Sequence, residues 1–193
     1  PPYIKDDEGN DTSEAAYFCA ANRNKRSVTL DISKPEGQAL AKRLIGTSQV
    51  LVENFKTGGL KKYGLSYDDL KDEFPGLIYC SITGFGQTGP YAMRPGYDVL
   101  IQGMGGLMSL NGDPDGEPMK AAIPVADLMA GMYAGVSINA ALRHREITGE
   151  GQHIDIGMLD VMVSFTTIMG MNYLATGNNP PRLGNEHPNI VPY

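Results

Sequence analysis

The stretch LIYCSITGFGQTGP, residues 77–90, joins an apolar run to a glycine-rich loop. The apolar run, Leu77 to Thr83, has the length and composition of a buried strand. Gly84, Gly86 and Gly89 then fit the spacing G-x-G-x-x-G, the fingerprint of dinucleotide-binding folds. The residues after this loop and the elements before the strand therefore decide whether the stretch belongs to a dinucleotide-binding fold.

The residues after the loop do not fit a dinucleotide site. Pro90, Pro95 and Gly96 follow the third glycine, so no amphipathic helix is expected to begin at Gly89. The fingerprint requires that helix, because its N-terminus binds the pyrophosphate. The match also falls on the third expected strand rather than the first. We interpret the stretch as a glycine-rich loop at the carboxyl end of a strand, where open α/β sheets bind ligands.

The elements upstream of this strand alternate between strand and helix. Pro35 is suited to the first turn of a helix, and Ser66 is suited to a helix N-cap. The β-α-β-α-β order predicts an α/β fold with an open, mostly parallel Rossmann-like sheet and helices on both faces. The strands are expected over residues 27–33, 49–55 and 77–83, and the helices over residues 35–46 and 66–75.

Helices are predicted for most of the chain downstream of the loop. Residues 1–13 are polar and turn-rich, whereas residues 14–24 predict a short helix. Small residues between positions 130 and 135 predict close packing of the longest helix. The downstream elements are expected to be helical stretches over residues 99–110, 128–146 and 157–175, with a short strand over residues 153–156.

The composition excludes several classes of protein. The 193 residues are 41% hydrophobic and 20% charged, which suffices for one sizeable core. The net charge is −6 and the basic residues are scattered, so no nucleic-acid partner is expected. We see no apolar run that predicts a membrane span, and the first residues fit no signal or transit peptide. A cytoplasmic protein is therefore expected.

Cysteine and histidine are too sparse for a predicted metal site. Cys19 and Cys80 are the two cysteines, and neither belongs to a C-x-x-C motif. Both thiols are expected to be buried and reduced. The three histidines lie far apart, and charged neighbours place His144 on the surface. No metal and no permanently bound cofactor are expected.

Asp127 is the carboxylate best placed for chemistry. It lies in IPVADLMAG, between a short apolar run and the longest expected helix. A plain N-cap is one interpretation, because Asp is a favoured capping residue. A nucleophile is the other, because a helix N-terminus keeps a carboxylate ionised. The two interpretations are compatible.

Three further segments carry polar or basic side chains at expected strand ends. The two basic segments have a bland interpretation as a solvated loop or a charged turn, because lysine and arginine are mostly exposed. The segment around Asn54 could instead hold an adenine ring and phosphates, and Tyr97 could be either a polar-tipped core residue or a site residue. The segments contain Asn54, Phe55, Lys56, Lys61 and Lys62; Arg23, Lys25 and Arg26; and Tyr97 and Asp98.

Six motifs along the chain resemble the class III CoA-transferase family, the CaiB/BaiF type. The resemblance covers essentially the whole chain, and within the family the chain is similar to the succinyl-CoA:dicarboxylate (glutarate-type) branch. The motifs are NRNKRSVTLDISKPEG (22–37), VLVENFKTGGLKKYGL (50–65), LIYCSITGFGQTGPY (77–91), RPGYD (94–98), VADLMAGMYA (125–134) and TGEGQHIDIGMLD (148–160).

The resemblance implies a reaction and a set of site residues. Members of this family move coenzyme A from an acyl-CoA, here expected to be succinyl-CoA, to a free carboxylic acid. Asp127 would be the nucleophile that forms an aspartyl mixed anhydride and then an aspartyl-CoA thioester. The residues implied to contact CoA are Leu30 and Ser33 near the adenine, Asn54, Phe55, Lys56 and Lys62 along the nucleotide and pantetheine, and Gly96, Tyr97 and Asp98 near the thioester.

Some details depart from the family pattern. Some relatives carry Arg at the position of Lys62 and Lys at that of Ser33, which leaves those phosphate contacts open. The family's racemases carry His where Tyr97 stands, and a neutral Tyr is a poor base near pH 7. A racemase or epimerase, or a non-catalytic CoA-binding protein, remains the alternative.

The resemblance also implies an assembly. Family members form interlocked homodimers from chains with a large and a smaller domain. Residues 1–193 are expected to be part of the large domain, without its first strand and without the second domain.

Overall fold

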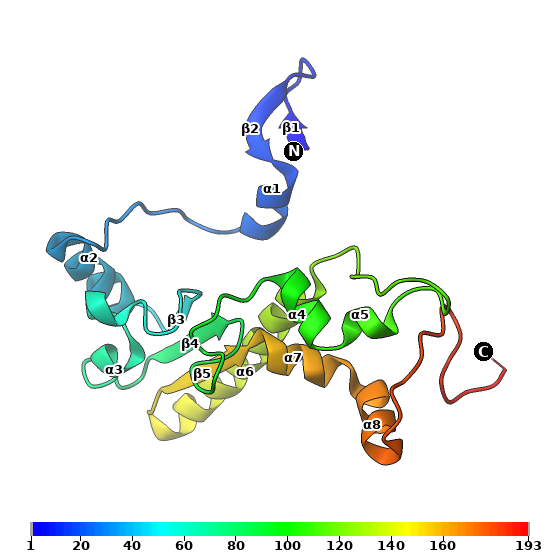
Figure 1. Ribbon diagram of the computed structural model, residues 1–193. Coiled ribbons are helices and arrows are strands. Elements are labelled where there is room, and N and C mark those ends of the chain that lie inside the picture. Colours follow the sequence, from blue (N-terminus) through cyan, green and yellow to red (C-terminus); the bar gives the residue numbers. More distant parts are fainter. Residues whose placement is uncertain (1, 193) are drawn as a thin grey trace. The chain divides into compact units, whose positions relative to one another are not determined.

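A computed structural model describes residues 2–192, and its internal contacts divide the chain into two units, Pro1–Asp31 and Ile32–Tyr193 (Figure 1). The first unit contains a hairpin of β1 (Tyr3–Lys5) and β2 (Asp11–Ala15), followed by α1 (Ala16–Asn22). The strands are antiparallel, and Lys5 Nζ lies 2.6 Å from Asp11 Oδ1 across them. The expected short helix is confirmed as α1. The polar, turn-rich residues before position 14 form this hairpin, whose strands were not predicted from the sequence.

The strand expected over residues 27–33 is wrong. These residues form no helix or strand, and within residues 2–192 no segment pairs with them. An alternating apolar pattern makes a strand only where a neighbour accepts its backbone hydrogen bonds. Val28, one of the residues in that pattern, is 64% exposed.

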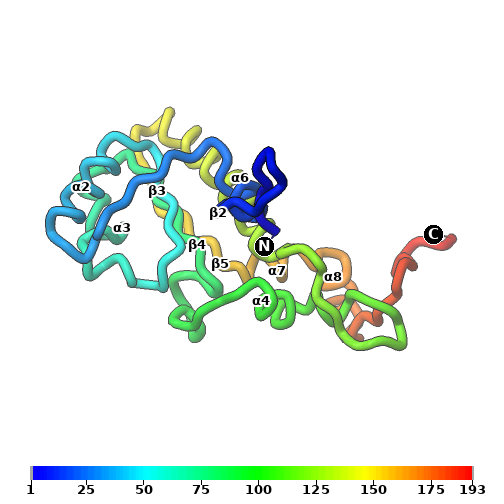
Figure 2. Tube along the Cα trace, turned by 90° about the horizontal axis from the view of Figure 1, so that it is seen from above, coloured from blue at the N-terminus to red at the C-terminus, as the bar shows by residue number. Residues whose placement is uncertain are grey.

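The second unit is built on a three-stranded sheet (Figure 2). Its strands are β3 (Val50–Glu53), β4 (Ile78–Thr83) and β5 (Gln152–Gly157), in the order β3-β4-β5. Both pairings are parallel, with Val50 opposite Ile78 and Ile78 opposite Gln152. The predicted parallel sheet is therefore confirmed, with β4 in its centre.

Helices cover both faces of this sheet, as predicted. Side chains alternate along β4, so Ile78 and Cys80 join one apolar cluster whereas Tyr79 joins the other. The first cluster is completed by α4 (Asp98–Met104), α6 (Val125–Thr148) and α7 (Met158–Phe165). The second is completed by α2 (Pro35–Gly46) and by the segment that contains η1 (Lys61–Tyr63) and α3 (Tyr67–Leu70). The backbone N–H of Ser66 donates to Asp69 Oδ2, which confirms the expected start of α3.

The long helix α6 packs through its alanines. Ala126, Ala130, Ala134 and Ala141 are buried, which confirms the close packing expected from small residues. The neighbouring glycines 131 and 135 face open space instead. By length and mean hydropathy α6 could also cross a membrane, contrary to the expectation from the sequence, and a core helix passes the same test.

The helix expected over residues 157–175 is two helices. The helix α7 ends at Phe165, and α8 (Thr167–Thr176) continues at an angle of 76°. Thr167 has a φ of +34°, which lies outside the α-helical range and interrupts the helix. The earlier glycine- and methionine-rich stretch forms α4 and α5 (Leu107–Leu110), as expected.

Candidate active site

The glycine-rich loop leaves the carboxyl end of β4 and returns to the sheet before α4. Within the described residues no helix begins at Gly89, and the next helix starts at Asp98. Gly86 has a φ of +79°, and the Gln87 N–H beside it donates to Asp155 Oδ2 at 2.8 Å. The glycines therefore serve backbone turns of the loop, which agrees with the rejection of a dinucleotide fingerprint.

A pocket of about 180 Å³ lies at the carboxyl ends of β3 and β4. Five residues that the sequence implicates in CoA binding line it: Asn54, Phe55, Lys56, Gly96 and Tyr97. The fold thus brings together two segments that are about 40 residues apart in the sequence. The location is the edge where open parallel sheets bind ligands.

Polar groups at the rim hold this pocket together. Asn54 Nδ2 donates to the Ile82 carbonyl oxygen at 2.5 Å, so the segment after β3 is tied to the end of β4. The Oγ1 of Thr83, another lining residue, is buried without a hydrogen-bond partner among residues 2–192. An unsatisfied buried hydroxyl is unusual, since native structures pair nearly all such groups. Tyr97 is 72% exposed, which excludes its interpretation as a core residue.

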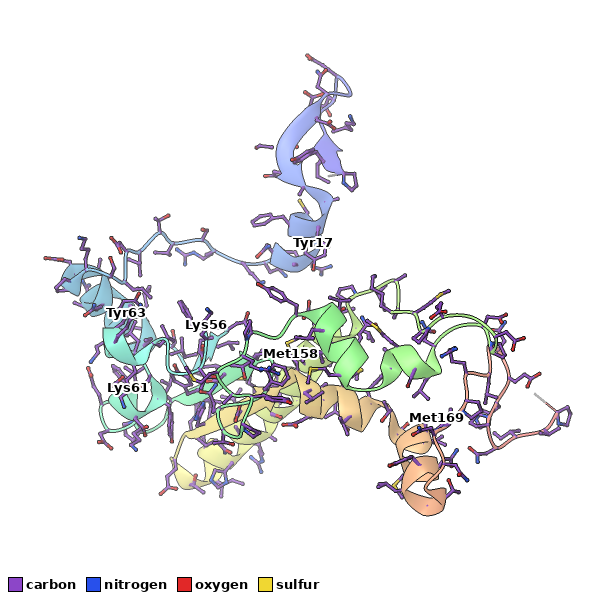
Figure 3. The ribbon with its side chains drawn as sticks, viewed as in Figure 1. Tyr17, Lys56, Lys61, Tyr63, Met158 and Met169 are labelled. Carbon is purple, nitrogen blue, oxygen red and sulfur yellow. The ribbon has the colours of Figure 1, made fainter. Side chains whose placement is uncertain are left out.

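A second cavity, of about 340 Å³, adjoins the same segment. Lys56 lines both cavities, and Lys61 contributes to the second one; both follow β3 in the chain (Figure 3). In this cavity Ser81 Oγ and His153 Nε2 are 2.9 Å apart, and the Tyr67 ring stacks on the imidazole at 4.8 Å. No role for His153 was predicted from the sequence. The feature that identifies His153 is the parallel register of β4 and β5, which places it opposite Tyr79.

Asp98 makes hydrogen bonds within the protein, and its implied contact with CoA stays a prediction. Its Oδ1 accepts hydrogen bonds from the backbone N–H of Ala126 at 2.8 Å and of Asp127 at 3.3 Å. Its Oδ2 accepts a bond from Gln102 Nε2 at 2.6 Å. The fully buried Gln102 in turn accepts from the Ala121 N–H at 2.8 Å. Gln102 was missed because nothing in the local sequence distinguishes a buried glutamine on an apolar helix.

Asp127 lies in the first turn of α6 but does not cap it. The N-cap is Pro124, so the N-cap interpretation of Asp127 is wrong. The helix begins three residues earlier than predicted, and the acceptor for its first amides comes from Asp98. Asp127 is exposed, and the partial desolvation of its carboxylate together with the nearby Asp98 carboxylate raises its pKa.

Besides Asp98, three of the predicted CoA contacts do not line this pocket: Leu30, Ser33 and Lys62. Leu30 belongs to the first unit and Ser33 to the second. Among the described residues, Lys62 lines neither cavity; its Nζ lies 4.7 Å from the centre of the Tyr63 ring. The roles of these three residues stay predictions. His144 is exposed, as expected.

The two cysteines agree only in part with their predicted burial. Cys80 is buried, as expected, but Cys19 is only partly buried, because α1 buries none of its residues. Residues 2–192 bring no three His, Cys, Asp or Glu side chains together as a possible metal site.

Comparison with known proteins places these features in a family. The sequence profile of CoA-transferase family III matches residues 3–193. The chain is 54% identical, over its whole length, to the succinate–glutarate CoA-transferase of Agrobacterium fabrum and 39% identical to the mouse succinyl-CoA:glutarate CoA-transferase. It covers 48% and 43% of these two proteins, so it spans about half the length of the curated relatives it matches. The crystal structure of a CaiB/BaiF family protein from Brucella suis superposes with a TM-score of 0.91 at 53% identity, covering all of this chain and 50% of that one.

Proposed function

The chain belongs to CoA-transferase family III, and on that premise we propose that the full-length protein transfers coenzyme A from an acyl-CoA to a free carboxylic acid. The donor we propose is succinyl-CoA, and the acceptor a small dicarboxylic acid. Two relatives that match this chain over its whole length are named succinate–glutarate and succinyl-CoA:glutarate CoA-transferase, which supports this substrate class.

One observation carries the proposal. Residues from the ends of β3 and β4 and from the segment before α4 line one pocket, and Asp98, next in the chain after Tyr97, binds the turn that holds Asp127. Tyr97 lines the pocket and the adjacent Asp98 binds the turn of Asp127, so these two residues connect the pocket to the proposed nucleophile. Lys56 supplies a cation to this pocket for a phosphate, and the Phe55 ring, 47% exposed, supplies an apolar surface.

The chemistry we propose for Asp127 is covalent catalysis. A carboxylate oxygen attacks the thioester carbonyl, the C–S bond breaks, and a mixed anhydride and CoA thiolate result. The thiolate attacks the aspartyl carbonyl, which releases the donor acid and leaves an aspartyl-CoA thioester. The acceptor carboxylate attacks that thioester and forms a second anhydride with release of the thiolate. The thiolate then attacks the acceptor's acyl carbon, which yields the new acyl-CoA and regenerates Asp127.

We also propose the setting of this reaction. Coenzyme A is a substrate rather than a bound cofactor, and the described residues form part of the large domain of an interlocked cytoplasmic homodimer. The half of the relatives' length that lies outside this chain supports a larger protein. Light scattering of the full-length protein tests the dimer, and a monomeric mass would reject it.

The transfer itself is tested by incubating the full-length protein with succinyl-CoA and a panel of free acids. Mass spectrometry identifies any new acyl-CoA and thereby the acceptor. Asp127→Asn is expected to abolish its formation. Asp115→Asn, in an exposed turn, is the matched control and is expected to keep it. Unchanged transfer by Asp127→Asn would reject Asp127 as the nucleophile.

A further inference from the structure

A directed chain of hydrogen bonds links α4 to the first turn of α6. It runs from the Ala121 N–H to Gln102 Oε1, from Gln102 Nε2 to Asp98 Oδ2, and from the Ala126 and Asp127 N–H groups to Asp98 Oδ1. The chain therefore clamps both ends of the segment that leads into α6.

We propose that Asp98 and Gln102 are positioning residues that fix the backbone carrying the Asp127 carboxylate. This inference rests on the proposed function, because it assumes that Asp127 is the nucleophile. It assigns Asp98 to the protein's own helix N-terminus rather than to the CoA molecule, and it assigns a role to Gln102.

The first reason is the start of α6. The first amides of a helix have no partner within the helix, and a side chain at the N-cap usually accepts one of them. The N-cap of α6 is Pro124, whose side chain has no acceptor. Ala126 is fully buried, so water cannot replace the missing acceptor at its N–H. Asp98 meets this requirement from another helix.

The second reason is the direction of the chain of bonds. Each oxygen of Asp98 has at least one donor, and three N–H groups converge on the side chain. Gln102 is fully buried and uses its oxygen toward Ala121 and its nitrogen toward Asp98. The Gln102 amide satisfies the Ala121 N–H and the Asp98 carboxylate only in the orientation observed, because the flipped amide would place its nitrogen against the N–H and its oxygen against the carboxylate. Glu or Leu at position 102 would break one or both bonds.

The third reason is the charge of Asp98 beside the nucleophile. A carboxylate that orients the turn also lies close to Asp127, and its charge contributes to the raised pKa of that residue. The same side chain thus fixes the position of the nucleophile and makes it more basic.

The test compares Asp98→Ala, Asp98→Asn and Gln102→Leu in the full-length protein. Asp98→Ala removes every acceptor, and kcat with succinyl-CoA is expected to fall about 100-fold, with KM within about threefold, because a small misplacement of a reacting group has this effect. Asp98→Asn keeps one oxygen for the two amides and is expected to retain at least about ten times the kcat of Asp98→Ala. Gln102→Leu is expected to lower kcat as well. Asp69→Asn, which changes the carboxylate at the start of α3, is the matched control and is expected to keep kcat.

Hydrogen–deuterium exchange of the peptide that covers residues 121–128 gives a readout independent of activity. Exchange is expected to be faster in Asp98→Ala than in the unchanged protein and intermediate in Asp98→Asn. A raised KM with unchanged kcat in Asp98→Ala would overturn the inference, because Asp98 would then be a substrate contact. Unchanged exchange would overturn it too. If Asp127→Asn retained transfer, the proposed role of Asp127 as the nucleophile would fail instead, and the exchange data would still report on the bonds from Asp98 to α6.

Discussion

Gly84 and Gly96 lie back to back, so closely that a Cβ on Gly84 would be 2.5 Å from the Cα of Gly96. A Cβ on Gly96 would likewise overlap the Cα of Gly84. This approach joins the end of β4 to the segment before α4, and both residues line the proposed CoA pocket. Two glycines are needed because backbone atoms on both sides occupy the space of a side chain.

Replacing Gly84 by Ala is therefore expected to destabilise the fold by about 1–3 kcal/mol, the usual effect of overpacking. The thermal midpoint of the full-length protein would fall by several degrees, and CoA binding would weaken because the pocket wall moves. Gly131→Ala is the control, since a Cβ there meets nothing within 4 Å and alanine favours a helix. Equal midpoints for both variants would contradict the close approach.

The parts of the fold that were predicted correctly from the sequence are those with local signals. The helix at 35–46 begins with a proline and ends at a glycine, and the strand at 77–83 is a continuous apolar run. Each signal lies inside the element that it specifies. The loop before α4 was also predicted correctly, because two prolines stand in it.

The parts that failed depend on contacts with distant residues. An alternating pattern at 27–33 could not show that none of residues 2–192 would pair with it as a neighbouring strand. The start of α6 was misplaced because its acceptor, Asp98, lies 28 residues away from Ala126. Family motifs identified Asp98 and Tyr97 as site residues, but only the fold distinguishes the Asp98 carboxylate that binds α6 from the exposed Tyr97 ring.

Lys56 is expected to contribute to CoA affinity. It lines both cavities, and a hydrogen bond to a charged phosphate contributes about 1.5–3 kcal/mol. Lys56→Ala should therefore weaken CoA binding roughly tenfold to a hundredfold in isothermal titration calorimetry. The loss should shrink at high salt, because ions screen exposed charges. Lys42→Ala, on α2 and paired with Glu73, should leave the affinity unchanged, and an equal loss there would point to a general effect of charge.

Cys80 is expected to resist alkylation. Burial in the centre of the sheet raises the pKa of its thiol to about 11. At pH 8 roughly one thiol in a thousand would be ionised, and the thiolate is the reactive form. Peptide mass spectrometry after iodoacetamide should show rapid labelling of the partly buried Cys19 and slow labelling of Cys80 until the protein is denatured. Equal labelling rates in the folded protein would contradict the burial of β4.

Asp127 is expected to lower the stability of the fold at neutral pH. Its pKa is raised in the folded state, so folding favours the protonated form. Stability from this group is fully present below its unfolded pKa of about 3.9 and is lost as the pH rises through the higher folded value. Asp127→Asn should therefore raise the thermal midpoint at pH 7, and the gain should shrink toward pH 4.

The contribution of the Asp98 charge to the raised pKa of Asp127 can be tested separately. Part of the shift comes from its charge, so Asp127→Asn should raise the midpoint less in an Asp98→Asn background than in the unchanged protein. The same charge is expected to act on catalysis, because the proposed attack on the thioester requires an ionised Asp127. The acidic limb of kcat should therefore move to lower pH in Asp98→Asn. A midpoint gain that is equal in both backgrounds, with an unmoved limb, would mean that burial alone raises the pKa of Asp127.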